Sequence, residues 1–298
     1  MGGPKVGCAG LAGIHSHTLV VMSSTNATPL ASAGSLSISI VVHRLNDAEL
    51  CRNLLTLRLA VDRLPKPNAS LTLIDNSERS GLASALRSVA MQTRWPDAMI
   101  LSGHGNVGYG AGHNLAIRAT AATTHLVLNP DVELDPDALR HGLLTLSQEA
   151  CVLVGAVGCD ADGNPGYLSK RMPSIGVFYL RGFAPAWLKK RFEKRLAHYE
   201  YRDLPAHRVS DVTLVSGAFM LCRTDALIAI GGFDERYFLH FEDLDLSRRM
   251  AARGRVVSDP RVTLIHHGGN AAKKGAGHLK LFLRSALRFF NTHGWRWL

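Results

Sequence analysis

From residue 36 onward, short apolar runs typical of strands alternate with runs whose apolar residues have helical spacing. The strand-like runs are LSISIVV (36–42), SLTLID (70–75), AMILS (98–102) and THLVLNPD (124–131). This alternation predicts an α/β fold with a mostly parallel central sheet flanked by helices. Ligands of such sheets bind beyond the carboxyl ends of the strands, so residues that directly follow strands are candidates for a site.

The net charge of +10 is concentrated in two segments. Residues 170–208 carry ten Lys or Arg and three Asp or Glu, and residues 260–298 carry seven Lys or Arg and no acidic residue. Such segments predict an anionic partner such as a phospholipid surface or a lipid diphosphate, and a solvated face without a partner is the alternative. Nucleic acid is not expected, because the chain has no recognition motif for it.

The chain ends differ from the middle. Residues 1–34 are rich in Gly, Ala, Ser and Thr, and we expect a disordered extension or a translation start placed too early. A folded domain is predicted over residues 35–270, followed by a basic amphipathic helix over residues 271–298. One face of that helix carries Leu279, Phe282, Leu283, Ala286 and Phe290, and another carries Lys280, Arg284 and Arg288. A helix at a membrane interface and a terminal helix packed on the core fit this pattern equally well.

Within the predicted domain, residues 168–203 are basic, aromatic and irregular in pattern, which favours a mobile or surface-binding segment. The five cysteines include no C-x-x-C pair, which predicts a reducing compartment, the cytoplasm. No apolar run approaches the length needed to cross a bilayer as a helix.

A glycine-rich stretch raises a first functional hypothesis. Residues Gly103 to Gly108 fit the dinucleotide fingerprint G-x-G-x-x-G, and Asp131 follows at about the expected distance. An NAD(P)-dependent oxidoreductase would, however, carry this fingerprint in its first strand-to-helix turn. Here two strands and two helices come first, and the loop continues into Gly110 and Gly112.

Asp131 is also a metal candidate. Pro130 ends the strand before it, so the carboxylate projects at the edge of the sheet, where it could hold a divalent cation with phosphate oxygens and water. A helix cap is the alternative, and Asp135 suits that role better.

Glu242 and Asp243 follow an aromatic run at the start of a helix-like segment. Acids are common in a first helical turn without catalytic meaning, but a carboxylate against an aromatic wall can be a general base for a hydroxyl. His266 and His267 end the strand-like run RVTLI; most such histidines are ordinary, yet imidazole suits a metal or a diphosphate.

Six stretches in the correct order resemble family 2 glycosyltransferases of the GT-A fold, most closely their rhamnosyltransferase-like branch in O-antigen and cell-wall polysaccharide synthesis. The likeness covers residues 36–270 and includes LIDNSERSG, GNVGYGAGHNLAI, HLVLNPDVEL and YFLHFEDLDLSRRM. It implies a Rossmann-like nucleotide-binding half plus an acceptor half, and inverting transfer of a sugar from a nucleotide donor to an acceptor hydroxyl.

The resemblance also implies roles for individual residues. It places Asp243 as the general base with Glu242 beside it, and Asp131 as the ligand of Mg²⁺ or Mn²⁺ with His266 or His267 near the diphosphate. Asn129 stands where the family's metal motif has its first Asp, and His43-Arg44 where the family more often has Tyr-Asn. The implied nucleotide-sugar-binding residues are Asp75, Asn106, Gly108, Gly110, Asn114 and Asn129.

The implied donor is dTDP-L-rhamnose, and the implied acceptor is a saccharide on a lipid diphosphate. We expect the protein on the inner face of the plasma membrane, bound to anionic lipid through residues 170–208 and 271–298. A non-catalytic nucleotide- or membrane-binding module is the remaining alternative. It is disfavoured because Asp131 and Asp243 are both retained.

Overall fold

The computed structural model describes residues 35–268 and 275–297. The predicted N-terminal extension, residues 1–34, and the predicted boundary at residue 270 lie outside the described residues. Within the described residues, no helix combines the length and the apolar character needed to cross a bilayer.

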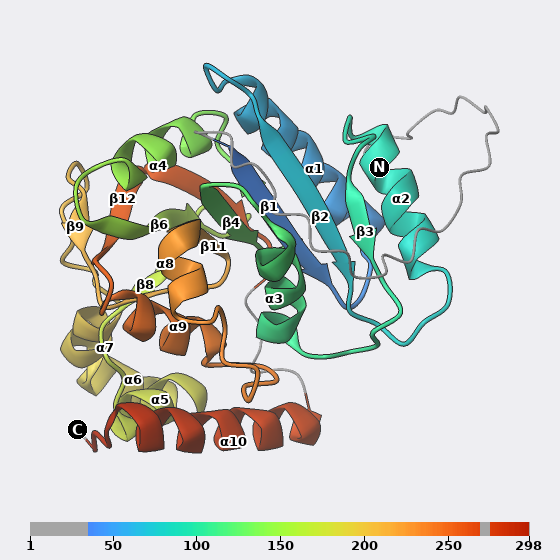
Figure 1. The fold of residues 1–298 in the computed structure, drawn as a ribbon. Coiled ribbons are helices and arrows are strands. Elements are labelled where there is room, and N and C mark those ends of the chain that lie inside the picture. Colours follow the sequence, from blue (N-terminus) through green and yellow to red (C-terminus); the bar gives the residue numbers. More distant parts are fainter. Residues whose placement is uncertain (1–34, 269–274, 298) are drawn as a thin grey trace, which may run out of the picture.

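The first half of the chain forms the parallel part of the sheet (Figure 1). Its strands lie in the order β3-β2-β1-β4, and every neighbouring pair is parallel. The predicted alternation of strands and helices is therefore confirmed here. The elements are β1 (Leu36–Val42), α1 (Asp47–Asp62), β2 (Ala69–Asp75), α2 (Leu82–Gln92), β3 (Met99–Leu101), α3 (Tyr109–Ala119) and β4 (Thr124–Leu128).

The second half extends the same sheet in the order β4-β11-β6-β12-β5. Strand β11 is antiparallel to both of its neighbours, which the strand-helix alternation did not predict, while β6 and β12 are parallel. The elements here are β5 (Val132–Leu134), α4 (Ala138–Leu146), β6 (Cys151–Cys159), β7 (Pro165–Gly166), β9 (Ser210–Asp211), β11 (Phe219–Arg223), α8 (Thr224–Ala229), α9 (Glu242–Met250) and β12 (Arg255–His266).

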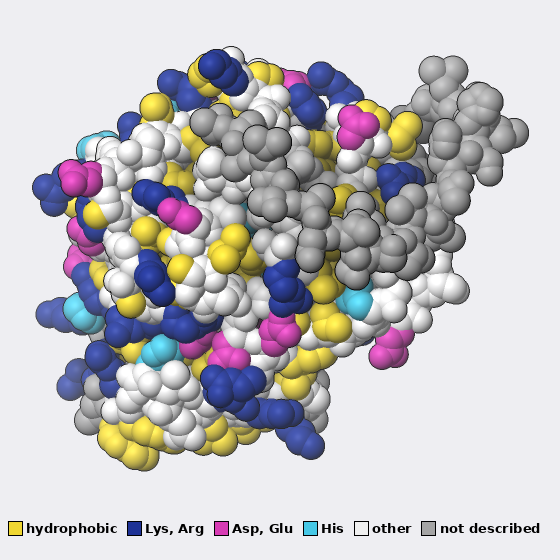
Figure 2. Space-filling view, in the orientation of Figure 1, with side chains coloured by type: hydrophobic (Ala, Val, Ile, Leu, Met, Phe, Trp, Pro, Cys, Tyr) yellow, Lys and Arg dark blue, Asp and Glu magenta, His cyan; other side chains and the backbone are white. Residues whose placement is uncertain are grey.

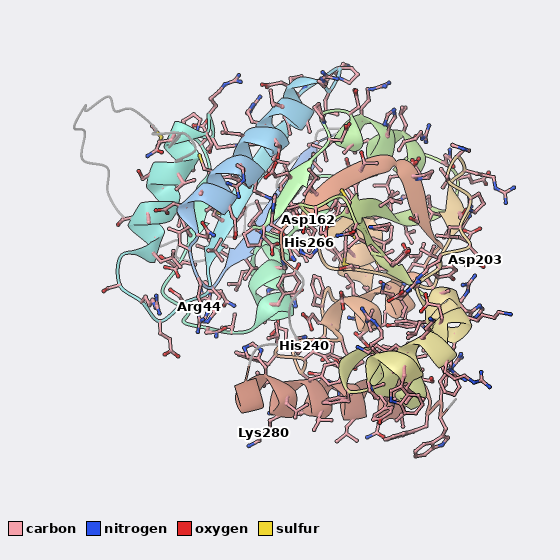
Figure 3. The ribbon with its side chains drawn as sticks, turned by 180° about the vertical axis from the view of Figure 1, so that it is seen from behind. Arg44, Asp162, Asp203, His240, His266 and Lys280 are labelled. Atoms are coloured by element: carbon pink, nitrogen blue, oxygen red, sulfur yellow. The ribbon has the colours of Figure 1, made fainter. Side chains whose placement is uncertain are left out.

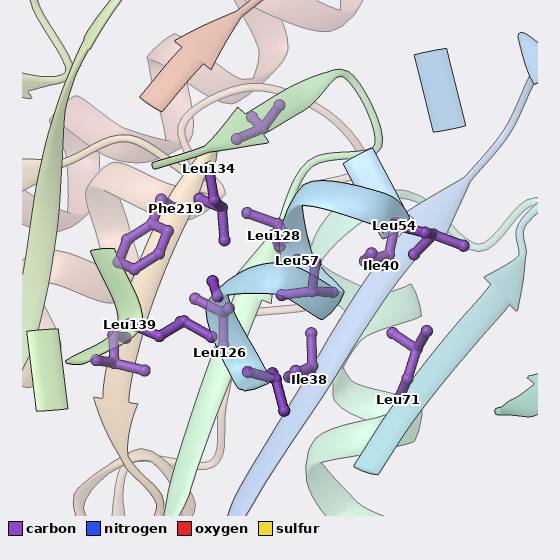
Figure 4. Close-up of a cluster of buried hydrophobic side chains, with 14 of the residues drawn as sticks. Ile38, Ile40, Leu54, Leu57, Leu71, Leu126, Leu128, Leu134, Leu139 and Phe219 are labelled. Atoms are coloured by element: carbon purple, nitrogen blue, oxygen red, sulfur yellow. The ribbon is translucent and has the colours of Figure 1, made fainter. Parts of the chain in front are cut away.

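Side chains that alternate along the strands fill a core on each face of the sheet. Along β4, Leu126 and Leu128 belong to one buried cluster and Val127 to another. The first cluster includes Leu54 and Leu57 from α1 and lies under α1, α2 and α4 (Figure 4). The second lies under α8 and α9. Helices on both faces confirm the predicted layered α/β architecture.

Residues 168–203 are more regular than the sequence pattern suggested. They contain a short strand and three helices, and the apolar side chains of Leu180 and Leu196 pack together. Short helices whose few apolar residues face one another leave no clear period in the sequence. The elements here and nearby are β8 (Ser169–Lys170), α5 (Ile175–Gly182), α6 (Ala186–Arg191), α7 (Glu193–Tyr199) and β10 (Leu214–Val215), which pairs with β8.

The C-terminal helix, α10 (Gly275–His293), packs on the rest of the protein through part of its predicted apolar face. Phe282, Ala286 and Phe290 pack in a cluster with Phe241. By contrast, Leu279 and Leu283, which were predicted on the same face, are 41% and 50% exposed. Figure 3 shows Lys280 on the side of α10 that faces away from the rest of the molecule.

Candidate active site

A cleft of about 820 Å³ lies beyond the carboxyl ends of the strands, as the fold predicts. Its walls come from segments that are far apart in the sequence, and α10 closes one side with His278 and Leu281. The polar side chains that line it are His43, Arg44, Asn76, Asn106, Tyr109, Asn129, Asp131, Ser216, Glu242 and Asp243.

Asn76 holds the glycine-rich loop in shape. Its Nδ2 donates to Asn106 Oδ1 and to the carbonyl of Gly108, each at 3.1 Å, and its Oδ1 accepts from Val107 N at 3.0 Å. Gly108 has a φ of 94°, and a Cβ there would lie 2.5 Å from the carbonyl oxygen of Phe238. Glycine is therefore required where this loop meets the chain that leads to Glu242.

Asn106, Gly108 and Asn129 line the cleft, but the other three predicted nucleotide-sugar residues do not. Asp75 is buried at the end of β2 and accepts from Ser77 N and Oγ at 3.1 and 2.7 Å. Asn114 accepts from Phe233 N at 2.8 Å and donates to Phe233 O at 2.9 Å. Gly110 also packs on Phe233, which a Cβ would approach to 2.8 Å. Gly110 and Asn114 thus hold α3 against the loop before α9, and they do not face the cleft.

Asp131 and His266 meet at one side of the cleft. Asp131 Oδ1 lies 3.3 Å from His266 Nε2, which is also 3.5 Å from Asn129 Nδ2. Burial opposes ionisation of Asp131, but His266 and His267 outweigh it and hold the pKa of that carboxyl below its usual value. A Cβ on Gly268 would lie 1.9 Å from Asp131 Oδ2, so only glycine lets the chain pass this carboxylate. In Figure 3 His266 lies near the middle of the molecule.

His267 turns the other way. Its Nε2 lies 2.6 Å from Glu133 Oε1, and Glu133 also accepts from Arg52 at 2.8 Å. Of the three residues predicted to bind metal, the structure therefore places Asp131 and His266 together and directs the ring of His267 to a different carboxylate.

The Asp131 site suits a metal ion whose remaining ligands come from the substrate and water. Nowhere in the described ranges do three His, Cys, Asp or Glu side chains converge as a metal-binding group. Asp131 Oδ1 is nevertheless buried without a hydrogen bond, beside an imidazole nitrogen. One carboxylate and one imidazole fit a divalent cation whose other ligands are phosphate oxygens and water.

Glu242 and Asp243 begin α9 on the side of the cleft opposite to Asp131. The two residues before them, His240 and Phe241, both have a φ of 70°, a strained conformation for residues other than glycine. Asp243 accepts from Gly217 N at 2.9 Å and from Leu244 N at 2.8 Å.

Both carboxyl groups resist ionisation. Burial, followed by the charge of Asp243, raises the pKa of Glu242 to about 8. Burial also raises the pKa of Asp243, although its backbone N–H donors oppose the shift. At neutral pH the pair therefore holds a proton, and the hydrogen-bonded Asp243 is the better placed to be the carboxylate.

Tyr109 connects the two sides of the cleft, and the sequence analysis missed it. Its hydroxyl lies 2.9 Å from Asn129 Oδ1 and 2.7 Å from the carbonyl oxygen of Gly217. Burial, and then the charges of Glu242, Asp243 and Asp131, raise the pKa of this hydroxyl well above its usual value. The only sequence signal was its place in the glycine-rich loop, since its partners are distant in the chain.

The mostly parallel sheet and its flanking helices define an α/β fold of the GT-A type, and the sequence comparison identifies the family. The model described as "Glycosyltransferase like family 2" matches residues 36–267, so the chain belongs to this glycosyltransferase family. The predicted family and enzyme class are confirmed, and the oxidoreductase alternative is wrong.

Two curated proteins are similar along most of this chain. The N-acetylglucosaminyl-diphospho-decaprenol L-rhamnosyltransferase of Mycobacterium tuberculosis is 30% identical over 263 residues, which cover 82% of this chain and 81% of that protein. The O-antigen biosynthesis protein RfbC of Myxococcus xanthus is 28% identical over 242 residues, covering 78% of this chain and 17% of that protein.

Two solved structures share the fold at 14% identity and 85% coverage of this chain. The mannosyltransferase PcManGT of Pyrobaculum calidifontis, in complex with GDP-Man and Mn²⁺, has a TM-score of 0.57 and is covered over 64% of its chain. GalNAc-T7, with UDP, GalNAc and Mn²⁺, has a TM-score of 0.60 and is covered over 47%. The chain thus spans less than two thirds of either structure.

Proposed function

We propose that the protein is an inverting glycosyltransferase that moves L-rhamnose from dTDP-L-rhamnose to a hydroxyl of a lipid-linked saccharide in surface polysaccharide synthesis. The observation that carries this proposal is the placement of Asp131 with His266 on one side of a cleft and of Asp243 on the other. The name of the mycobacterial relative supports both the sugar and a lipid diphosphate acceptor.

The donor would bind between Asp131 and the glycine-rich loop, which Asn76 holds through Asn106 and Gly108. Asp131 and His266 would hold Mg²⁺ or Mn²⁺, as the Mn²⁺ in the two solved relatives supports. When bound, the cation would neutralise the charge that develops on the departing diphosphate. The hydrogen bond between Tyr109 and Asn129 would fix the side of the cleft that carries Asp131.

On the acceptor side, Asp243 would take the proton of the acceptor hydroxyl. At the same time the hydroxyl oxygen would bond to the anomeric carbon of the donor sugar, and the bond between that carbon and the diphosphate would break. Attack from the face opposite to the leaving group inverts the anomeric configuration. The N–H groups of Gly217 and Leu244 aim the carboxylate, and a protonated Glu242 keeps a second negative charge out of the site.

The surface beside the cleft would rest on the membrane at the inner face of the plasma membrane. Exposed apolar side chains on α5, α6 and α10 lie among Lys and Arg, a composition that favours anionic interfaces. Figure 2 shows dark blue Lys and Arg and yellow hydrophobic side chains over the lower part of the molecule, at the level of these helices in Figure 1. We call this surface the basic-aromatic face; it comprises Phe183, Trp187, Lys190, Leu283, Arg284 and Leu287.

A panel of nucleotide sugars tests the proposed donor. Purified wild-type protein should hydrolyse or transfer from dTDP-L-rhamnose faster than from UDP- or GDP-sugars, and EDTA should abolish turnover until Mg²⁺ or Mn²⁺ is restored. Preference for another donor would overturn the sugar assignment, and full activity in EDTA would overturn the metal assignment.

A further inference from the structure

A second cavity of about 360 Å³ lies on the far side of the carboxylate pair from the Asp131 site. It shares Ser216, Glu242 and Asp243 with the donor cleft, so a molecule in it would reach the proposed base. Its other walls include residues of β8, α5 and α7, which do not line the donor cleft, and of α10, which lines both.

Cations gather at this second cavity. Lys170 and Arg181 both line it, 5.8 and 5.6 Å from the ring of Tyr199. Glu200 lies 3.4 Å from Arg181 and 2.6 Å from Arg202, so one carboxylate is shared by two arginines. Lys170 and Arg181 therefore supply positive charge for an anionic ligand on the wall formed by β8 and α5, while Glu242 and Asp243 line another part of the cavity.

Lys170 is the cation that an anionic ligand would stabilise most. Its ammonium group is largely buried and donates to the carbonyl of Tyr167. Burial, and then the like charge of Arg181, lower the pKa of Lys170 to about 7, although Glu200 opposes the shift. A bound anion would stabilise the charged ammonium, which is why a buried Lys beside an Arg suits a phosphate ligand.

The remaining walls are apolar. Phe178 stands edge-on to Tyr199 at 6.4 Å and to Phe282 at 5.6 Å, and both rings also line the cavity. Aromatic walls with a few charged groups are typical of sites for amphipathic ligands such as a sugar carried on a lipid. Helix α10, which supplies Phe282, also carries Leu283, Arg284 and Leu287 of the basic-aromatic face, and Phe183 of that face directly follows α5, which supplies Phe178.

We propose that this cavity is the acceptor site, and that Lys170 and Arg181 bind the diphosphate that joins the acceptor sugar to its lipid. The proposal rests on the proposed transfer to a lipid-linked saccharide and names the part of the protein that recognises it. The acceptor sugar then lies against Asp243, and the lipid leaves along α5 and α10 towards the basic-aromatic face. The donor's diphosphate stays on the opposite side, with Asp131 and His266.

Two lipid-linked acceptors, one with a diphosphate and one without, test the proposal in detergent solution. One is N-acetylglucosamine on a short prenyl diphosphate, and the other is the same sugar as a neutral octyl glycoside. The variants are Lys170→Met and Arg181→Met, and the matched control is Lys66→Met, which removes an exposed cation from the loop between α1 and β2, where it lines neither cavity. Lys170→Arg keeps the charge, and unfolding midpoints show which variants are folded.

Loss of one charge-assisted contact should raise the KM for the diphosphate acceptor about 10- to 100-fold in Lys170→Met and Arg181→Met. We expect Lys170→Arg and Lys66→Met to stay near wild type, and donor hydrolysis and the KM for the octyl glycoside to be unchanged in all variants. Equal KM values for the diphosphate acceptor in Lys170→Met, Arg181→Met and Lys66→Met would overturn the proposal. A wild-type protein that uses no nucleotide sugar would instead refute the proposed function itself.

Discussion

Glu242 is the residue whose environment differs most from that of an ordinary carboxylic acid. In the unfolded chain it titrates near its usual value, whereas burial and Asp243 raise its pKa to about 8 in the folded protein. A raised pKa in the folded state contributes stability at low pH that is lost as the pH rises through the folded pKa. The carboxyl pair therefore lowers the stability of the fold on the alkaline side.

Glu242→Gln should remove this pH dependence. Relative to wild type, the variant should gain on the order of a few kcal/mol in unfolding free energy between pH 5 and pH 8, because an amide cannot ionise. Urea unfolding at several pH values measures this, with Glu78→Gln on the surface as the control. Parallel stability curves for wild type and Glu242→Gln would show that the carboxyl is not held protonated.

At the scale of elements, α3 is tied to the loop before α9 by Asn114, whose amide hydrogen-bonds both backbone groups of Phe233. Asn114→Ala leaves a buried N–H and a buried C=O without their partner, so we expect a loss of about 1–3 kcal/mol in stability. The loop positions Glu242 and Asp243, so kcat should fall as well. Urea unfolding and kinetics check this against Gln92→Ala on the exposed side of α2; a variant that behaves like this control would contradict the role given to Asn114.

The sequence predicted helices and strands well where one periodic pattern dominates. It predicted residue roles and strand directions less well where they depend on contacts with distant parts of the chain. Helix α3 and its glycines were expected, but the role of Asn114 depends on Phe233, which lies far along the chain. Likewise, the direction of β11 depends on which strands it joins, and the contrast between His266 and His267 depends on Asp131 and Glu133. Local patterns carry no information about such partners.

At the scale of the whole molecule, the basic-aromatic face should bind anionic membranes. Wild-type protein should float with liposomes that contain phosphatidylglycerol at low salt, less at high salt, and not with neutral liposomes, because the attraction is electrostatic and screened. Leu283→Asp should weaken flotation, whereas Leu144→Asp on the exposed side of α4 should not. Equal flotation of the two variants would place the membrane contact elsewhere.

The central claim is that Asp243 is the base of a glycosyl transfer in the cleft it shares with Asp131. The most direct measurement compares the transfer rates of wild type, Asp243→Asn and Asp97→Asn, the last an exposed Asp before β3, with the donor and acceptor that wild type uses. We predict a loss of about 100-fold or more in kcat for Asp243→Asn, unchanged folding, and wild-type activity for Asp97→Asn. A folded Asp243→Asn enzyme that transfers sugar as fast as Asp97→Asn would contradict the account.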